Sequence, residues 1–144
     1  METMNGDVTT EGVFEPATLS DARDAYESVG PAAQTVVRET ASAMEFDREE
    51  YRDRVTSEVV ETARDALFAS LLVVHVGDRE AFESWRAETD VAVTTFGSDG
   101  VDGVVWHVAP AVDSAVATTF QAERDAAVAT CRRQAFGRLY RDEL

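Results

Sequence analysis

The spacing of apolar and polar residues predicts a chain that begins with helices and turns to strands in its later part. Residues 18–29 carry apolar side chains at helical spacing, and the Gly30-Pro31 pair predicts that a second helix follows after a tight junction. Asp47 and Glu50 have the spacing of a capping box, which predicts a short charged helix after them. Before this region, residues 1–15 show no period and predict a flexible leader.

Residues 57–76 include the most apolar stretch of the chain. They begin with an amphipathic pattern and become apolar on nearly every side over residues 66–76. A helix that is apolar all round is normally buried. We therefore predict one central helix over 57–76, followed by a helix that Asp78 caps. The side chains expected to be nearly inaccessible are Leu67, Leu71 and Val74.

The period changes to two in residues 90–97 and 103–110, which predicts two strands. The Asp99-Gly100 pair between them is a hairpin turn signal, so we predict that the two strands pair with each other. In that hairpin one face carries Val91, Val93, Val104, Trp106 and Val108, and the other carries Ala92, Thr94, Phe96, Val105 and His107.

Residues 113–141 complete the pattern as one long predicted helix. The predicted fold class is α+β, with five or six helices around the buried central helix and one antiparallel β-hairpin. The predicted domain organisation is a leader over residues 1–15 and a single domain over residues 16–144. A chain of 144 residues is the size of one domain, which agrees with this organisation.

The charge of the chain predicts its environment. Asp and Glu number 28 against 13 basic residues, which gives a net charge of −15; every basic residue is Arg, and neither Lys nor Ile occurs. Dispersed charge of one sign destabilises a compact chain unless salt screens it, and at molar salt the Debye length is about 3 Å. We therefore expect a halophilic protein whose solvent is concentrated hydrated K⁺ and salt. With no long apolar run and no basic, apolar leader, we expect a cytoplasmic protein that does not enter a membrane.

Several segments together resemble a small haloarchaeal protein family known only as a domain of unknown function. The segments that carry the resemblance are GPAAQTVVRE, AMEFDREEYRDRVT, VVETARDALFASLL, VVWHVAP and FQAERDAAVATCRRQAFGRLYRDEL. The resemblance covers almost the whole chain after residue 11. It implies an archaeal origin, but it implies no activity and no catalytic residue.

Known catalytic motifs do not occur in the sequence, so we expect no metal and no cofactor. Cys131 is the single cysteine, which excludes an internal disulfide. The two histidines, His75 and His107, lie far apart in the sequence, and nothing in their spacing to Cys131 enforces the three or four converging ligands of a zinc site. His75 is expected in the last turn of the central helix. We expect both histidines to be structural.

The last predicted helix carries the remaining candidate chemistry. Arg124 lies in line with apolar residues, so we expect it to be at least half buried and paired with a residue of another element. A small enzyme would use His75, His107, Arg124 or Glu123 in an unrecognised arrangement. The basic zone of this helix consists of Arg132, Arg133, Arg138 and Arg141, which could bind an anion, a partner or a nucleic acid. We do not expect nucleic-acid binding, because phosphate contacts weaken steeply with salt.

An isolated two-stranded hairpin is marginal in water, which raises the question of what covers its second face. A second copy of the chain could cover Phe96, Val105 and His107, and this favours a homodimer. Alternatively, the last helix folds over this face within one chain. We therefore predict a non-catalytic domain that self-associates or binds a partner, with a small enzyme and an Arg-patch nucleic-acid binder as alternatives.

Overall fold

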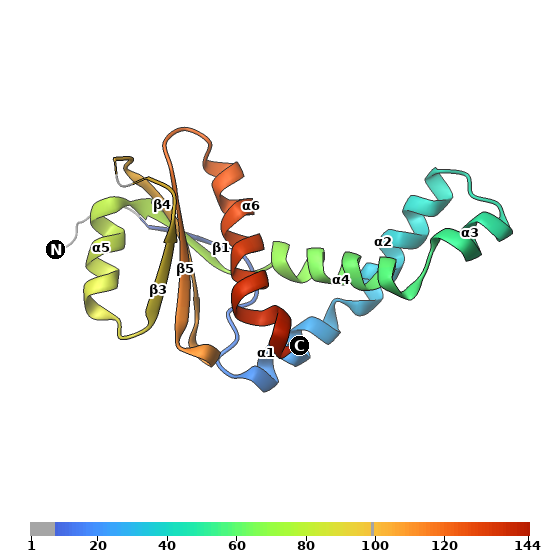
Figure 1. Ribbon diagram of the computed structural model, residues 1–144, viewed down its shortest axis with the longest axis horizontal. Helices are drawn as coiled ribbons and strands as arrows, with labels where there is room; N and C mark the ends of the chain where they lie inside the picture. The colour runs from blue at the N-terminus through green and yellow to red at the C-terminus, as the bar shows by residue number, and fades with distance from the viewer. Residues whose placement is uncertain (1–7, 99) are drawn as a thin grey trace.

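The computed structural model describes residues 8–98 and 100–144, so residues 1–7 of the predicted leader and Asp99 of the predicted turn lie outside the described residues. The described chain forms a five-stranded mixed sheet with the strand order β1-β2-β4-β5-β3. Helix α5 lies on one face of the sheet and α6 on the other (Figure 1). The strands are β1 (Thr9–Glu11), β2 (Val74–Asp78), β3 (Ala92–Phe96), β4 (Gly103–Ala109) and β5 (Ser114–Phe120). The α-helices are α1 (Leu19–Ser28), α2 (Gly30–Ala43), α3 (Arg48–Arg54), α4 (Ser57–Ser70), α5 (Arg79–Glu88) and α6 (Arg124–Ala135).

The predicted fold class was wrong about the sheet, because β3 and β4 are both strands but do not pair with each other. Strand β4 lies between β2 and β5 and is antiparallel to both, whereas β3 is parallel to β5 at the edge. The hairpin of this fold is β4–β5, which turns through residues 110–112 and through Asp113 in the left-handed region at φ 51°. The long helix predicted over residues 113–141 was wrong in its first part, because Ser114–Phe120 forms strand β5 and α6 begins at Arg124. Without β5, the prediction lacked the strand that pairs with β4 in the hairpin.

The predicted central helix over 57–76 was also wrong. Helix α4 ends at Ser70, and the apolar residues that follow form β2. Val74 is fully buried as a strand residue, whereas Leu67 and Leu71 are only half-buried. A short apolar run fits a buried strand as well as a buried helix, and the β-branched Val73-Val74 pair favours the strand.

The predicted caps at Asp47 and Asp78 were confirmed, and two further helices are capped by threonine. Thr18, Thr56 and Asp78 each accept a hydrogen bond from a backbone N–H in the first turn of the helix that they cap. Asp47 and Glu50 form the predicted capping box of α3. These interactions span only three residues, so the sequence determines them without reference to the rest of the fold.

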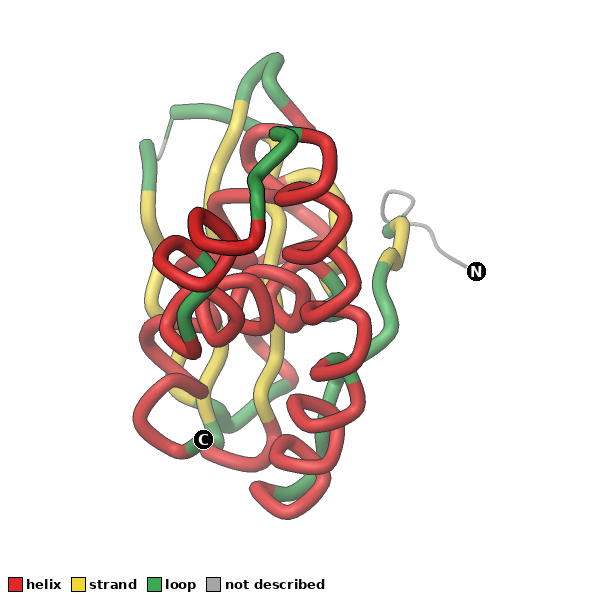
Figure 2. The backbone as a smooth tube through the Cα atoms, turned by 90° about the vertical axis from the view of Figure 1, so that its right-hand side faces the viewer, coloured by secondary structure: helices red, strands yellow, loops and turns green. Residues whose placement is uncertain are grey.

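Helices α2, α3 and α4 extend away from the sheet, with α3 at the far end (Figure 1). Figure 2 views the molecule from that side and shows helices in front of the strands. We call residues 30–66 the arm and the rest of the described chain the body. Within the arm α2 packs against α4, and α4 meets α6 at the arm's root.

Residues 8–15, which were predicted to belong to the leader, contribute to the sheet. Strand β1 pairs antiparallel with β2, and Phe14 makes a parallel bridge to Leu72. Between them Gly12 has a φ of 116° and lies against the backbone of Leu72, where a side chain would meet the Leu72 carbonyl oxygen. A glycine is required at this close approach.

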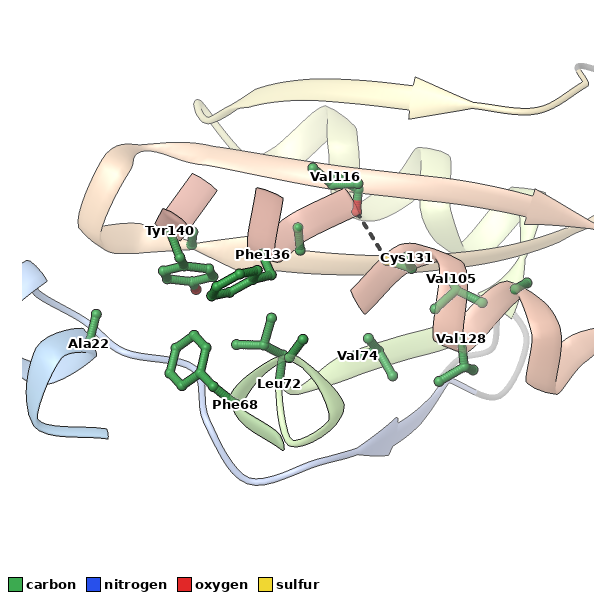
Figure 3. Close-up of a cluster of buried hydrophobic side chains, with 14 of the residues drawn as sticks. Ala22, Phe68, Leu72, Val74, Val105, Val116, Val128, Cys131, Phe136 and Tyr140 are labelled. Carbon is green, nitrogen blue, oxygen red and sulfur yellow. Dashed lines mark hydrogen bonds between the residues drawn. The ribbon is translucent and has the colours of Figure 1, made fainter. Parts of the chain in front are cut away.

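The larger of two hydrophobic clusters fills the space between the sheet, α6 and the end of α4 (Figure 3). Phe68 lies at its centre, and its ring contacts the rings of Phe14, Tyr26, Phe136 and Tyr140 at centroid distances of 5.5–5.9 Å. The smaller cluster lies under α5 on the other face and contains Phe82, Val104, Trp106 and Ala117. The alternation of residues in 103–110 therefore predicted correctly which side chains share a face of the sheet. The predicted partner strand, β3, was wrong, because β4 pairs with β2 and β5.

Candidate interaction surface

An apolar groove of about 480 Å³ runs along the arm. Val37 and Ala41 face inward from α2 and are buried, whereas Val36 and Met44 on the same helix and Val59 on α4 remain exposed at 46%, 58% and 41%. The lining residues are Val36, Val37, Thr40, Ala41, Met44, Phe46, Arg54, Val55, Val59, Thr62, Ala63 and Ala66. The exposed large apolar side chains of the described chain are therefore concentrated on the arm.

The groove differs in charge from the rest of the molecule. Its described lining contains no carboxylate and one arginine, Arg54, whose guanidinium lies over the Phe46 ring at 5.5 Å. The whole chain carries 28 carboxylates. An apolar surface without the carboxylates that dominate elsewhere is suited to bury against another apolar surface.

A second cleft, of about 440 Å³, lies at the arm's root between α4, β1 and α6. Arg124 at the start of α6 makes ion pairs with Glu11 of β1 and with Asp125. Arg132 donates from Nε to the Leu72 carbonyl oxygen at 2.9 Å, and Arg133 donates to the Thr130 hydroxyl at 3.3 Å. Two carboxylates, Glu11 and Asp125, also line the root cleft, and both pair with Arg124. Among the described residues neither Arg132 nor Arg133 has a carboxylate partner.

Arg124 bears out the expected partner from another element, and its side chain is 37% exposed. The hydrogen bond to Glu11 is the main cause that raises its pKa above the usual value. Asp125, the next residue in the chain, also pairs with Arg124. Glu123 is exposed and precedes α6 without capping it.

His107 is fully buried between the sheet and the end of the chain. Its Nδ1 lies 2.5 Å from the Val73 carbonyl oxygen, and its Nε2 lies 2.6 Å from the Tyr140 hydroxyl. A carbonyl oxygen can only accept, so Nδ1 carries the proton and Nε2 accepts from Tyr140. Burial lowers the pKa of His107 to about 4, so the ring is neutral at pH 7 and serves as a structural link.

His75 was expected at a helix end but lies in β2, on the other face of the sheet from His107. Its ring packs at 5.7 Å from the Trp106 ring, and its nitrogens contact Thr10 and Glu15 at 3.2 Å each. Cys131 is buried and donates to the Val116 carbonyl oxygen, and burial raises the pKa of its thiol to about 12. The structure therefore does not bring His75, His107 and Cys131 to one site, and the described residues contain no cluster of three or more metal ligands.

The four arginines of the predicted basic zone lie in different surroundings. Arg132 and Arg133 line the root cleft. Arg138 lies over the Phe96 ring at 4.7 Å, and Arg141 lies over the Phe136 ring at 5.1 Å. The last two cover aromatic rings of the body, so the four do not form one continuous basic stripe.

The predicted dimer face is largely internal. Val105 and His107 have no exposed surface, and Val105 belongs to the cluster that α6 covers within the same chain. Phe96 is half-buried beneath Arg138. Of the two explanations for this face, the structure favours the covering helix, and a second copy would have to bind elsewhere.

Comparison with known proteins identifies the family of the chain. The model of a family of unknown function, DUF5809, matches residues 13–141. The chain belongs to the DUF5809 family. No curated protein and no solved structure matches it. No described helix of this DUF5809 chain is long and apolar enough to cross a membrane.

Sequence reasoning missed the groove of this DUF5809 chain, although it found the residues. In the sequence, an apolar stripe runs along the second predicted helix and consists of Val36, Val37, Thr40, Ala41 and Met44. The stripe is wider than α4 alone can cover, so Val36 and Met44 extend beyond the contact. The signal in the sequence is an apolar stripe too wide for one neighbouring helix to cover, followed by a short charged helix. Such a stripe indicates that part of the helix surface stays exposed.

Proposed function

We propose that this DUF5809 protein is a non-catalytic domain of the haloarchaeal cytoplasm that self-associates through the groove of its arm. The observation that carries the proposal is the exposed apolar lining of Val36, Met44 and Val59 in a groove without carboxylates. Helical hairpins that leave one apolar side uncovered bury it most simply by pairing into a four-helix arrangement.

A second copy is the occupant that the charge pattern favours. Two chains of net charge −15 repel each other, so contact is least unfavourable where carboxylates are absent. A second copy related by a two-fold axis presents the same carboxylate-free lining to the first. The apolar groove of each copy is then covered by the other. Concentrated KCl screens the repulsion between the remaining charges and therefore strengthens the pairing.

Sedimentation in 2 M KCl tests the proposal. We expect twice the chain mass of 15.7 kDa for the wild type and one chain mass for Val59→Asp, because a carboxylate would then be buried in the contact. Val13→Asp is the matched control, since Val13 is 65% exposed on the body and the same change there leaves the dimer intact. Circular dichroism checks that each variant is folded. A wild type that stays monomeric at high micromolar concentration contradicts the proposal.

The proposed salt adaptation has its own measurement. The melting temperature of the wild type should rise between 0.1 and 3 M KCl, because screening removes the self-repulsion of the folded chain. For a chain of this size a stabilisation of 1 kcal/mol corresponds to a shift of about 3–4 °C. A melting temperature that stays flat or falls across this range contradicts the halophilic part of the proposal.

A further inference from the structure

The groove of the arm and the cleft at its root adjoin at α4. Ala66 lines both, and the cleft beyond it is lined by Arg132 and Arg133. Glu11 and Asp125, the two carboxylates that line this cleft, are already paired with Arg124. A partner that fills the groove to its end therefore meets two arginines for which the described residues provide no carboxylate partner.

The opposite end of the arm is acidic. We call residues 45–54 the tip. The tip carries five carboxylates and three arginines, a net charge of −2, and Glu49 and Asp53 are exposed there. The groove begins at Phe46 and Arg54 of this tip and ends at Ala66 of the root. The groove therefore runs from the acidic tip of the arm to the root cleft, where α6 of the body supplies Arg132 and Arg133.

From this arrangement we infer that the two arms of the dimer lie antiparallel, with the acidic tip of each copy seated in the root cleft of the other, against Arg132 and Arg133. The inference rests on the proposed self-association and specifies its geometry. Helix α4 has 14 residues and a length of about 21 Å, so a partner arm that covers the whole groove places its tip at the root.

Electrostatics distinguishes this arrangement from a parallel one. Parallel arms would place two tips of net charge −2 together. They would also bring the two bodies side by side. The arm carries five arginines and nine carboxylates, so −11 of the chain's net charge of −15 lies on the body and residues 1–7, and two adjacent bodies would repel each other. The antiparallel arrangement separates the bodies to opposite ends and places each acidic tip against Arg132 and Arg133, whose guanidinium groups have no carboxylate partner among the described residues.

Cross-linking of single-cysteine variants tests the geometry. Cys131 is fully buried, and its thiol pKa of about 12 keeps it protonated, so an introduced surface cysteine reacts alone with a maleimide. Arg52→Cys marks the tip and Ala129→Cys marks the root cleft, and both leave the tip carboxylates and Arg132 and Arg133 in place. Ala87→Cys, exposed on α5 at the other face of the sheet, is the matched control for Ala129→Cys.

The variants are mixed in pairs in 2 M KCl, treated with a short bis-maleimide and analysed by sedimentation and denaturing electrophoresis. We expect a covalent dimer from Arg52→Cys mixed with Ala129→Cys, and none from Arg52→Cys alone or mixed with Ala87→Cys. A cross-link from Arg52→Cys alone would show parallel arms and overturn the inference. A sedimenting dimer without a tip-to-root cross-link would also overturn it but would leave the proposed function standing, whereas monomers would overturn both.

Discussion

The body and the arm use the same small apolar residues, but they differ in how far these residues are covered. In the body both faces of the sheet are filled, so that Val104 and Val105, which are neighbours on β4, are both fully buried on opposite sides. In the arm Val37 is buried, but Val36 beside it is 46% exposed. Folding of one chain therefore completes the core of the body and leaves the arm with an uncovered side. This difference predicts that stability depends mainly on the body, and it is the basis of the proposed association through the arm.

The largest expected effect is the loss of an aromatic ring from the body. Phe68→Ala should lower the free energy of unfolding by about 3–5 kcal/mol, because it removes a fully buried ring that contacts four others and leaves a cavity. Val59→Ala in the arm should cost less than about 1 kcal/mol at concentrations where the chain is monomeric, since Val59 is 41% exposed. Chemical denaturation of both variants measures the two values, and equal costs would remove the distinction between body and arm.

The next effect is a pH dependence that comes from the body. The folded pKa of His107 is lowered by burial to about 4, with smaller contributions from His75 and Arg132, against an unfolded value of about 6.5. The unfolded state therefore binds the proton first, so the stabilisation is complete above pH 6.5 and is lost as the pH falls towards 4. The loss should be roughly 3 kcal/mol.

A variant separates this titration from that of the many carboxylates. His107→Gln keeps a donor for the Val73 carbonyl oxygen but does not titrate, so its stability should decline less than that of the wild type between pH 6.5 and 4. Urea denaturation across this range gives both curves. Parallel curves would show that His107 is not held neutral by the fold.

The parts of this structure that the sequence predicts are those determined by near neighbours. The helix caps at Thr18, Asp47, Thr56 and Asp78 each depend on residues three positions away, and those at Asp47 and Asp78 were predicted. The alternation in β4 likewise separated its two faces. What the sequence left undetermined is which distant segments meet, because that depends on the whole chain.

Strand β5 shows why the prediction failed in one element. It lies between β4 and β3, and both of its faces are covered, so its residues show no alternation. With the period of two absent, the Ala-rich segment fitted a helix. One signal was present: the AVATTF segment of β5 resembles AVTTF of β3, which had been predicted as a strand. For the candidate surface the failure was different, because an apolar stripe indicates burial but not whether its partner lies in the same chain.

The smallest expected effect concerns the ion pair that joins β1 to α6 beside the arm's root. Arg124 and Glu11 are each 37% exposed, so water and salt weaken their attraction, and such pairs contribute about 0.2–1 kcal/mol. A double-mutant cycle of Glu11→Gln and Arg124→Gln should give a coupling energy in this range at 0.1 M KCl and close to zero at 3 M, because the Debye length falls to about 3 Å or less. Phe68→Ala should keep its full cost at both salt concentrations, since the burial of its ring involves no charge. A coupling energy that persists at 3 M KCl would mean that the packing of the body holds the pair in place, and not the attraction between exposed charges. The root cleft would then belong to the rigid body and not to the arm.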